Sequence, residues 1–145
     1  KEGVIAIEIR PKNTAIIHGV SKSTTMLIAN SSNGQTVLDY GAGKLRNAIK
    51  LLAHNLEVDI LDTETQINRI DKEKLLLFKN IYTPNNLPKQ QYDNIICSFV
   101  LNVIPKIEER IIVIRNIYQL IKPGGYAYFE VRKDRGISSN KTNLP

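Results

Sequence analysis

Two kinds of hydrophobic pattern alternate along the chain between residues 35 and 132. Short apolar runs typical of buried strands lie at residues 36–39, 57–61, 75–78, 93–98 and 126–131. Apolar residues spaced as on one face of a helix lie at residues 45–54, 63–70 and 107–120. Residues 82–91 contain two prolines and predict a loop. In the last helix, the expected buried face is Ile111, Ile114, Ile117, Tyr118 and Ile121, and Pro123-Gly124-Gly125 is expected to stop this helix.

This alternation predicts the fold class. Strands that alternate with helices run parallel, and the connections between them are right-handed. The chain is therefore expected to adopt an α/β fold, a doubly wound and mostly parallel sheet of about five strands within residues 35–132. Ligands of such sheets bind beyond the carboxyl ends of the strands, where the strand order reverses. The first strand-to-helix turn, within residues 37–46, is the expected ligand site.

The two flanking segments have weaker patterns. Residues 1–34 are expected to form an N-terminal extension, with a strand or hairpin arm at residues 4–9 and a helix at residues 21–29 that covers the edge of the sheet. Residues 133–145 are polar and are expected to form a partly disordered tail.

Composition narrows the functional classes. The chain has 145 residues, of which 42% are hydrophobic and 23% charged, as in one globular domain. No apolar run approaches the ~20 residues that cross a bilayer, so no membrane partner is expected. Cys97 is the only cysteine and there are two histidines, which excludes a disulfide within the chain and leaves a poor ligand set for zinc. No metal and a reducing, cytoplasmic location are expected.

The net charge of +6 permits contact with phosphates. The aromatic residues do not interleave with the basic residues as they would on a surface that stacks bases. Nucleic acid therefore stays one candidate partner beside small molecules.

The turn at Asp39-Tyr40-Gly41-Ala42-Gly43 has the strongest chemical pattern. Two glycines allow a ligand to approach the backbone closely, and the helix that follows offers free N–H groups. A dinucleotide site would have a third glycine where Arg46 stands. Asp62 ends the next strand, where a carboxylate commonly accepts hydrogen bonds from ribose hydroxyls. Together these features favour a nucleoside ligand without a pyrophosphate.

Several stretches together resemble the class I S-adenosylmethionine-dependent methyltransferases. Residues 37–43 look like the first motif of that family, and Asp62 matches its acidic residue after the second strand. Residues 92–104 look like its fourth-strand motif, and residues 120–128 like its turn into the fifth strand. The resemblance covers roughly residues 35–132.

The resemblance implies a cofactor, S-adenosyl-L-methionine, and roles for the matched residues. Gly41 and Gly43 would pass close to the methionine part, and Asp39 would orient the turn. Asp62 would bind the ribose, while residues 80–81 would flank the adenine. Residues 97–99 would lie under the cofactor near the transferred methyl group. The implied cofactor-binding residues are Asp39, Tyr40, Gly41, Ala42, Gly43, Asp62, Thr63, Asn80, Ile81, Cys97, Ser98 and Phe99.

Simpler roles remain open for several of these residues. Asp62 could end a strand or begin a helix, with Thr63 as the N-cap of that helix. Asn80 could be a turn residue, and Cys97 is more typical of a buried strand residue than of a nucleophile. No general base can be named. His18 and Asn102 are candidates to face a substrate.

These motifs do not identify the molecule that accepts the methyl group. The proline pairs typical of DNA-base amino methyltransferases are missing after the fourth strand, as is the Pro-Cys of cytosine-C5 enzymes. The family's strands six and seven have no counterpart after Arg132, which predicts either a fragment or a trimmed fold, with a sheet edge open to homodimer formation. The hypotheses are therefore a methyltransferase domain that acts on a small molecule or nucleic acid, or a non-catalytic binding or assembly module with the same fold. Arg46 counts against a dinucleotide-dependent enzyme.

Overall fold

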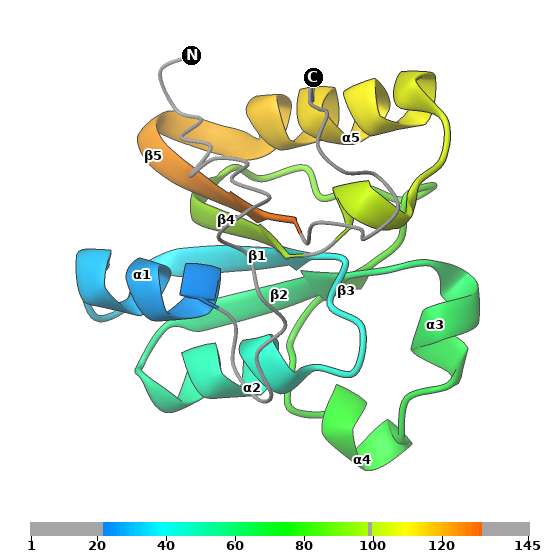
Figure 1. Ribbon diagram of the computed structural model, residues 1–145. Coiled ribbons are helices and arrows are strands. Elements are labelled where there is room, and N and C mark those ends of the chain that lie inside the picture. The colour runs from blue at the N-terminus through cyan, green and yellow to red at the C-terminus, as the bar shows by residue number, and fades with distance from the viewer. Residues whose placement is uncertain (1–21, 99, 132–145) are drawn as a thin grey trace.

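The computed structural model describes residues 22–98 and 100–131 and shows helices on both faces of a parallel sheet (Figure 1). The five strands lie in the order β3-β2-β1-β4-β5, and every paired strand is parallel. The strands are β1 (Thr36–Tyr40), β2 (Glu57–Leu61), β3 (Ile81–Tyr82), β4 (Tyr92–Ser98) and β5 (Ile121–Glu130). The α/β fold class and the doubly wound arrangement are thus confirmed.

The helices pack in two layers (Figure 1). On one face lie α1 (Lys22–Asn30) and α2 (Arg46–Ala53), and their Leu27 and Leu51 belong to a core with Ile60 and Tyr128 of the sheet. The opposite face is covered by α5 (Ile107–Leu120), which packs against a second core of strand residues. Along the chain, two short helices, α3 (Glu64–Asn68) and α4 (Lys72–Leu75), connect β2 to β3. The 3-10 helix Leu101–Val103 follows β4. None of the helices that the structure describes has the length and apolarity to cross a membrane.

The third strand lies later in the chain than the apolar run at residues 75–78 predicts. That run forms the end of α4 and the turn after it, and β3 pairs with β2 through Ile81 opposite Ile60. Leu76 and Leu77 are 83% and 53% exposed, so they do not form a buried strand. The prediction was wrong because a short apolar run has no periodicity that separates a strand from a helical turn.

The last predicted helix is confirmed at residues 107–120, and its predicted buried face is confirmed in part. Ile117 and Ile121 are buried and Ile114 packs against the same core. Ile111 and Tyr118 are instead 39% and 55% exposed. The helix also ends before the Pro123-Gly124-Gly125 segment, which belongs to the longer strand β5. Apolar residues surround most of this helix, so the sequence pattern alone could not identify the side that contacts the sheet.

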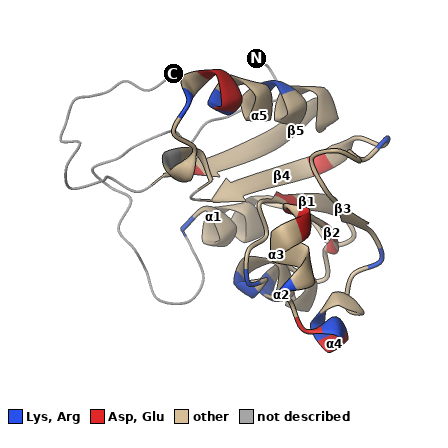
Figure 2. Cartoon of the chain, turned by 90° about the vertical axis from the view of Figure 1, so that its right-hand side faces the viewer, with Lys and Arg blue, Asp and Glu red and all other residues tan. Residues whose placement is uncertain are grey.

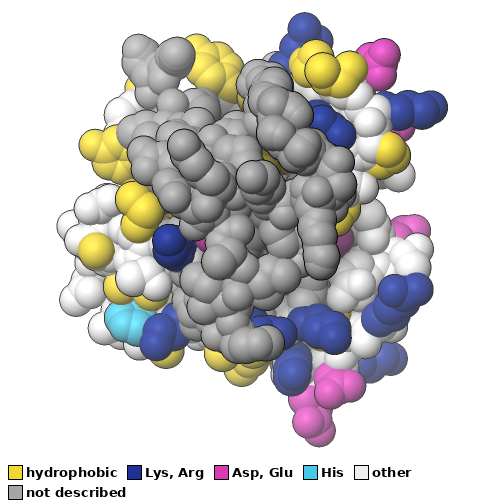
Figure 3. Space-filling view, viewed as in Figure 1, with side chains coloured by type: hydrophobic (Ala, Val, Ile, Leu, Met, Phe, Trp, Pro, Cys, Tyr) yellow, Lys and Arg dark blue, Asp and Glu magenta, His cyan; other side chains and the backbone are white. Residues whose placement is uncertain are grey.

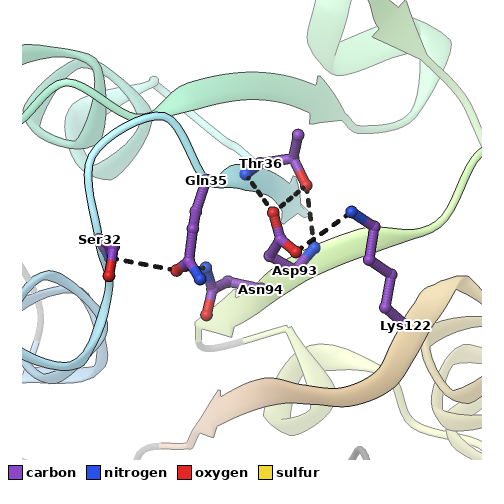
Figure 4. A network of polar contacts seen from close by, with 6 residues as sticks. All are labelled: Ser32, Gln35, Thr36, Asp93, Asn94 and Lys122. Carbon is purple, nitrogen blue, oxygen red and sulfur yellow. Dashed lines mark hydrogen bonds and ion pairs between the residues drawn. The ribbon is translucent and has the colours of Figure 1, made fainter.

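A polar network joins the amino ends of three strands (Figure 4). Thr36 of β1 donates from its backbone N and its hydroxyl to Asp93 Oδ2, at 2.9 and 3.1 Å, and Lys122 Nζ of β5 lies 3.2 Å from Asp93 Oδ1. Burial acts to raise the pKa of Asp93, but the hydrogen bonds from Thr36 and Lys122 outweigh it and lower the pKa. Beside this group, Asn94 donates to Gln35. The network holds the register of β1, β4 and β5 at the edge opposite the glycine turn.

Candidate functional site

The glycine turn follows β1 and is fastened to the end of β2. The backbone N–H groups of Gly41 and Ala42 both donate to Leu61 O, at 2.7 and 3.0 Å. Gly41 has φ 90°, and a Cβ at this position would overlap the side chain of Val100 from the segment after β4. The turn therefore requires glycine at position 41 for both its backbone conformation and its packing.

Two further residues of the turn, Gly43 and Leu45, have a left-handed backbone. Gly43 has φ 56° and Leu45, at the start of α2, has φ 72°. A left-handed leucine is strained by roughly 1–2 kcal/mol, yet its side chain is fully buried in the core beneath α2. Burial of a leucine side chain contributes a similar or larger amount, which offsets this strain. Nothing lies within 4 Å of a Cβ built on Gly43, so the turn is open at that point.

Asp62 follows β2 and lies beside the glycine turn. Its Oδ2 accepts a hydrogen bond from Gly43 N at 2.7 Å, and its Oδ1 accepts one from Thr63 N at 2.7 Å. Each carboxylate oxygen can accept a second hydrogen bond, so capacity for a diol remains. Thr63 is the N-cap of α3 and accepts from Gln66 N, as predicted.

Asp39, near the end of β1, is the most unusual group of the site. Its side chain is 2% exposed, and no residue of the described chain donates a hydrogen bond to its Oδ2. Burial, reinforced by the charge of Asp62, raises the pKa of Asp39 to about 7. A buried carboxylate that lacks a partner and lies near a second carboxylate creates a strong preference for a cationic ligand.

Two of the candidate residues belong to the core on the α5 side. Tyr40 is buried, and its hydroxyl accepts a hydrogen bond from Asn116 Nδ2 of α5 at 3.0 Å. Cys97 is 2% exposed in the same core. Burial raises the pKa of the Tyr40 hydroxyl, and burial together with Asp39 raises the pKa of the Cys97 thiol. Ala42 packs in the opposite core, so these three residues support the turn and β4 from within.

Asn80 precedes β3 and Ile81 is its first residue, so both come before the carboxyl end of this strand. Asn80 Nδ2 donates to Asp59 Oδ1 at 3.2 Å, and Asp59 also accepts from the Tyr92 hydroxyl at 2.7 Å. The group that lies beside Asp62 at the edge is Tyr82, whose carbonyl accepts from Asp62 N at 3.2 Å. Because the third strand was predicted too early in the sequence, the candidate residues did not include Tyr82.

Ser98, at the end of β4, shares a hydrogen bond of 2.7 Å with the Ser23 hydroxyl of α1. Phe99 and His18 lie outside the described residues, as does the side chain of Asn102.

Gln66 was also missed by sequence reasoning, although a signal was present. Its side chain donates to Gly43 O at 3.1 Å and so locks the turn to α3. The spacing Thr63-x-x-Gln66 matches a capping box, in which the glutamine usually turns back to the N-cap residue. Here Asp62 already accepts the Thr63 N–H, which leaves the glutamine side chain to bind the glycine turn.

A family model described as a methyltransferase domain matches residues 38–127, which is more than half of the chain. The chain belongs to this family. The matched range begins in β1, just before the glycine turn, and ends within β5, so it contains Asp39, Asp62 and at least part of every strand of the sheet.

The methyltransferase domain is also similar to a curated protein and to solved structures. It is 29% identical over 134 residues to YmfD of Escherichia coli (strain K12), which covers 82% of this chain and 61% of that protein. The glycopeptide N-methyltransferase MtfA, complexed with S-adenosyl-L-homocysteine, aligns with a TM-score of 0.68 at 14% identity over 98% of this chain and 61% of that chain. The SAM-bound amino pentose methyltransferase CalS10 from Micromonospora echinaspora aligns with a TM-score of 0.62 at 16% identity over 74% and 47%. The domain thus spans about 61% of the curated relative, and its fold is that of these enzymes.

The carboxylates of the methyltransferase domain fit S-adenosylmethionine, which carries an ammonium group, a sulfonium and a ribose diol. The orphaned Oδ2 of Asp39 and the remaining lone pairs of Asp62 are acceptors for the ammonium group and the ribose hydroxyls, and their negative charge also suits the sulfonium. The glycine turn is open at Gly43, so the backbone admits a ligand there. The residues present therefore fit this group by the chemistry of their side chains and by the open backbone at Gly43.

The environment of Cys97 leads to a prediction about its reactivity. Because burial raises the pKa of this thiol, almost no thiolate is present at neutral pH and the sulfur is shielded from reagents. We expect the native protein to resist iodoacetamide at pH 7.5 and to be alkylated once it is unfolded in guanidinium chloride. Mass spectrometry measures both states, and rapid alkylation of the native protein would contradict the placement of Cys97 in the core.

Proposed function

We propose that this chain binds S-adenosylmethionine and forms the core of a methyltransferase that transfers the methyl group to an external acceptor. One observation carries the proposal: Asp39 is a buried carboxylate with an unpartnered oxygen, and it lies near Asp62 beside an open glycine turn. Since like charges brought together in a buried place are unfavourable, such a pair favours a ligand that supplies positive charge. Membership of the methyltransferase-domain family supports the same ligand.

Each part of the site has a proposed role. Gly41 and Gly43 would lie along the methionine part of the cofactor, whose ammonium group would face Asp39. Asp62 would accept the ribose hydroxyls. Asn80 and Ile81 would support the adenine from below through their contacts with β2, and Tyr82 with Thr83 would flank it at the edge.

When bound, the sulfonium of the cofactor supplies an activated methyl group. The chain's own contribution is to position the reactants, which can lower a barrier by several kcal/mol. The turn is held by Leu61, Asp62 and Gln66, so its backbone is rigid before the ligand arrives. Such preorganisation matters because a mobile turn would lose conformational entropy when the ligand binds, and this loss would lower the affinity.

Calorimetric titration with S-adenosylmethionine and S-adenosylhomocysteine tests the proposal. We expect micromolar binding by the wild type and a loss of at least about tenfold in Asp62→Ala, since hydrogen bonds to a charged group contribute roughly 1.5–3 kcal/mol. Asp71→Ala is the matched control, because Asp71 is an exposed carboxylate at the start of α4. Absence of binding at millimolar ligand would overturn the proposal. Binding without transfer to any acceptor would instead support a non-catalytic module.

For the acceptor we propose a small molecule. Lys and Arg in the described part of the chain lie on α1, α2, α4 and α5 (Figure 2), among other places. On the face shown in Figure 3, Asp and Glu side chains lie beside several of the Lys and Arg side chains. Basic and acidic side chains mixed in this way favour a nucleic acid backbone less than a continuous positive surface would. The lone buried cysteine supports a reducing compartment such as the cytoplasm. The position of β5 at one edge of the sheet supports pairing with a second copy at that edge, which the mass of the protein in solution would test.

A further inference from the structure

A second buried carboxylate lies at the carboxyl edge of the sheet, on the side away from Asp62. Glu130 is the last residue of β5 and pairs in register with Ser98, the last residue of β4. Its Oε1 accepts a hydrogen bond from Ser23 N in the first turn of α1, at 2.9 Å. Ser23 and Ser98 share a hydrogen bond of 2.7 Å between their hydroxyls. These three residues therefore form a cluster where α1, β4 and β5 meet.

The second oxygen of Glu130 is left without a partner. The residue is 4% exposed, and no group within residues 22–98 and 100–131 donates a hydrogen bond to its Oε2. A cap for α1 needs only one acceptor, and a glutamine would supply it without the unfavourable burial of a charge. The carboxylate also has a second oxygen whose hydrogen-bonding capacity no described residue uses.

The order of the strands places this oxygen on the acceptor side of the site. Across the carboxyl edge, the acidic groups lie on β2 (Asp62), β1 (Asp39) and β5 (Glu130), with β4 between the last two. Neighbouring strands are about 4.8 Å apart, so β5 lies roughly 10 Å from β1. If Asp62 and Asp39 hold the cofactor, Glu130 lies beyond them on the side that remains for the molecule to be methylated.

We propose that Glu130 binds the amino group of the methyl acceptor through Oε2, which makes the acceptor an amine. This inference rests on the proposed function. The lone pair of the neutral amine forms the new N–C bond while the C–S bond breaks and its electron pair returns to sulfur. Positive charge then develops on nitrogen, where the carboxylate stabilises it, and the product ammonium loses its extra proton to water. Among amines and alcohols of equal shape, the site selects the amine.

The test uses the whole chain saturated with S-adenosylhomocysteine, which has no methyl group to transfer. Benzylamine and benzyl alcohol are titrated separately, and NMR follows the amide of Ser23, which is hydrogen-bonded to Glu130. We expect the wild type to bind benzylamine at least about tenfold more tightly than benzyl alcohol, because a hydrogen bond to a charged group contributes roughly 1.5–3 kcal/mol. Glu130→Gln retains an acceptor for Ser23 and removes the charge, so it should lose this preference.

Two further measurements separate recognition from folding. Glu130→Gln should bind S-adenosylhomocysteine within about twofold of the wild type and should unfold at the same or a higher temperature, since a buried charge is removed. Glu57→Gln, an exposed glutamate at the start of β2, is the matched control and should keep the amine preference.

The outcomes are distinct. An amine preference that survives in Glu130→Gln, or no amine binding by a wild-type complex that does hold S-adenosylhomocysteine, would overturn the assignment of Glu130. Failure of the wild type to bind S-adenosylhomocysteine at all would overturn the proposed function and this inference with it.

Discussion

Gly41→Ala should lower the free energy of unfolding by about 2–5 kcal/mol and weaken the binding of S-adenosylhomocysteine at least about tenfold. An alanine with φ near 90° is strained by roughly 1–2 kcal/mol, and the overlap of its Cβ with Val100 adds about 1–3 kcal/mol. Because the N–H of this residue bonds to Leu61, any shift of the turn also disturbs its attachment to β2. Urea unfolding and calorimetric titration measure the two effects.

A second variant and a matched control separate the two causes. Val100→Ala removes the overlapping methyl group and leaves only an ordinary contact with the Cβ at 3.6 Å, so the double variant should recover part of both losses. Gly34→Ala is the control, because Gly34 has φ 84° and nothing within 4 Å of an added Cβ. It should show the backbone strain alone and bind the cofactor normally. Equal effects of Gly34→Ala and Gly41→Ala would contradict the role assigned to Val100.

Asp39→Asn should stabilise the ligand-free protein at pH 8 by up to about 4 kcal/mol and leave its stability near pH 4 almost unchanged. The pKa of Asp39 is about 7 in the folded state and 3.8 in the reference state. The folded state therefore binds more protons between these values, and the stability of the wild type falls as pH rises from about 4 to 7. Above pH 7 the penalty is constant, at 1.36 kcal/mol for each pKa unit. Denaturant unfolding at several pH values measures the difference.

The same substitution should reduce cofactor affinity, because the ammonium group loses its counter-charge. In the wild type, the affinity for S-adenosylhomocysteine should rise with pH, by at most about tenfold per unit, and level off above about pH 7, where Asp39 is ionised without the ligand. Asp39→Asn should lack this dependence. The exposed Asp71→Asn is the control, and a stability difference between Asp39→Asn and wild type that does not vary with pH would contradict the burial effect.

These expectations describe a site that is less stable when empty than when occupied. Asp39 and Glu130 are both buried, and both have an oxygen with no partner among the described residues. Natural proteins often tolerate such unfavourable groups where a ligand later compensates for them. Two independent orphaned oxygens at the same edge of the sheet therefore point to two ligands, the cofactor on one side and the acceptor on the other.

Much of this arrangement could be predicted from residue order alone. The alternation of strands and helices predicted the parallel sheet, since parallel strands need crossover connections. The pair Gly41 and Gly43, placed directly after a buried strand, predicted the ligand turn because few residues other than glycine adopt such φ values. Asp62 follows the second strand, and its position beside that turn follows from the parallel register of β1 and β2.

Other features were decided by tertiary packing. The apolar run at Leu75–Phe78 could have been a strand, and only the exposure of Leu76 and Leu77 shows that it is not. The buried face of α5 depends on which side meets the sheet, because apolar residues occur around most of that helix. Sequence periodicity determines which residues can be buried together, while burial itself depends on long-range neighbours.

The electrostatic properties of the site likewise depend on neighbours that are distant in the chain. The sequence pattern placed Asp39 at the end of one predicted strand and Glu130 within another, through local patterns of hydrophobicity. Whether each oxygen finds a hydrogen-bond donor, and how far burial shifts a pKa, depends on groups that are distant in the chain, such as Ser23 for Glu130 and Asp62 for Asp39. Desolvation and Coulomb interaction act through space, so the electrostatic character of this site was decided only by the tertiary structure.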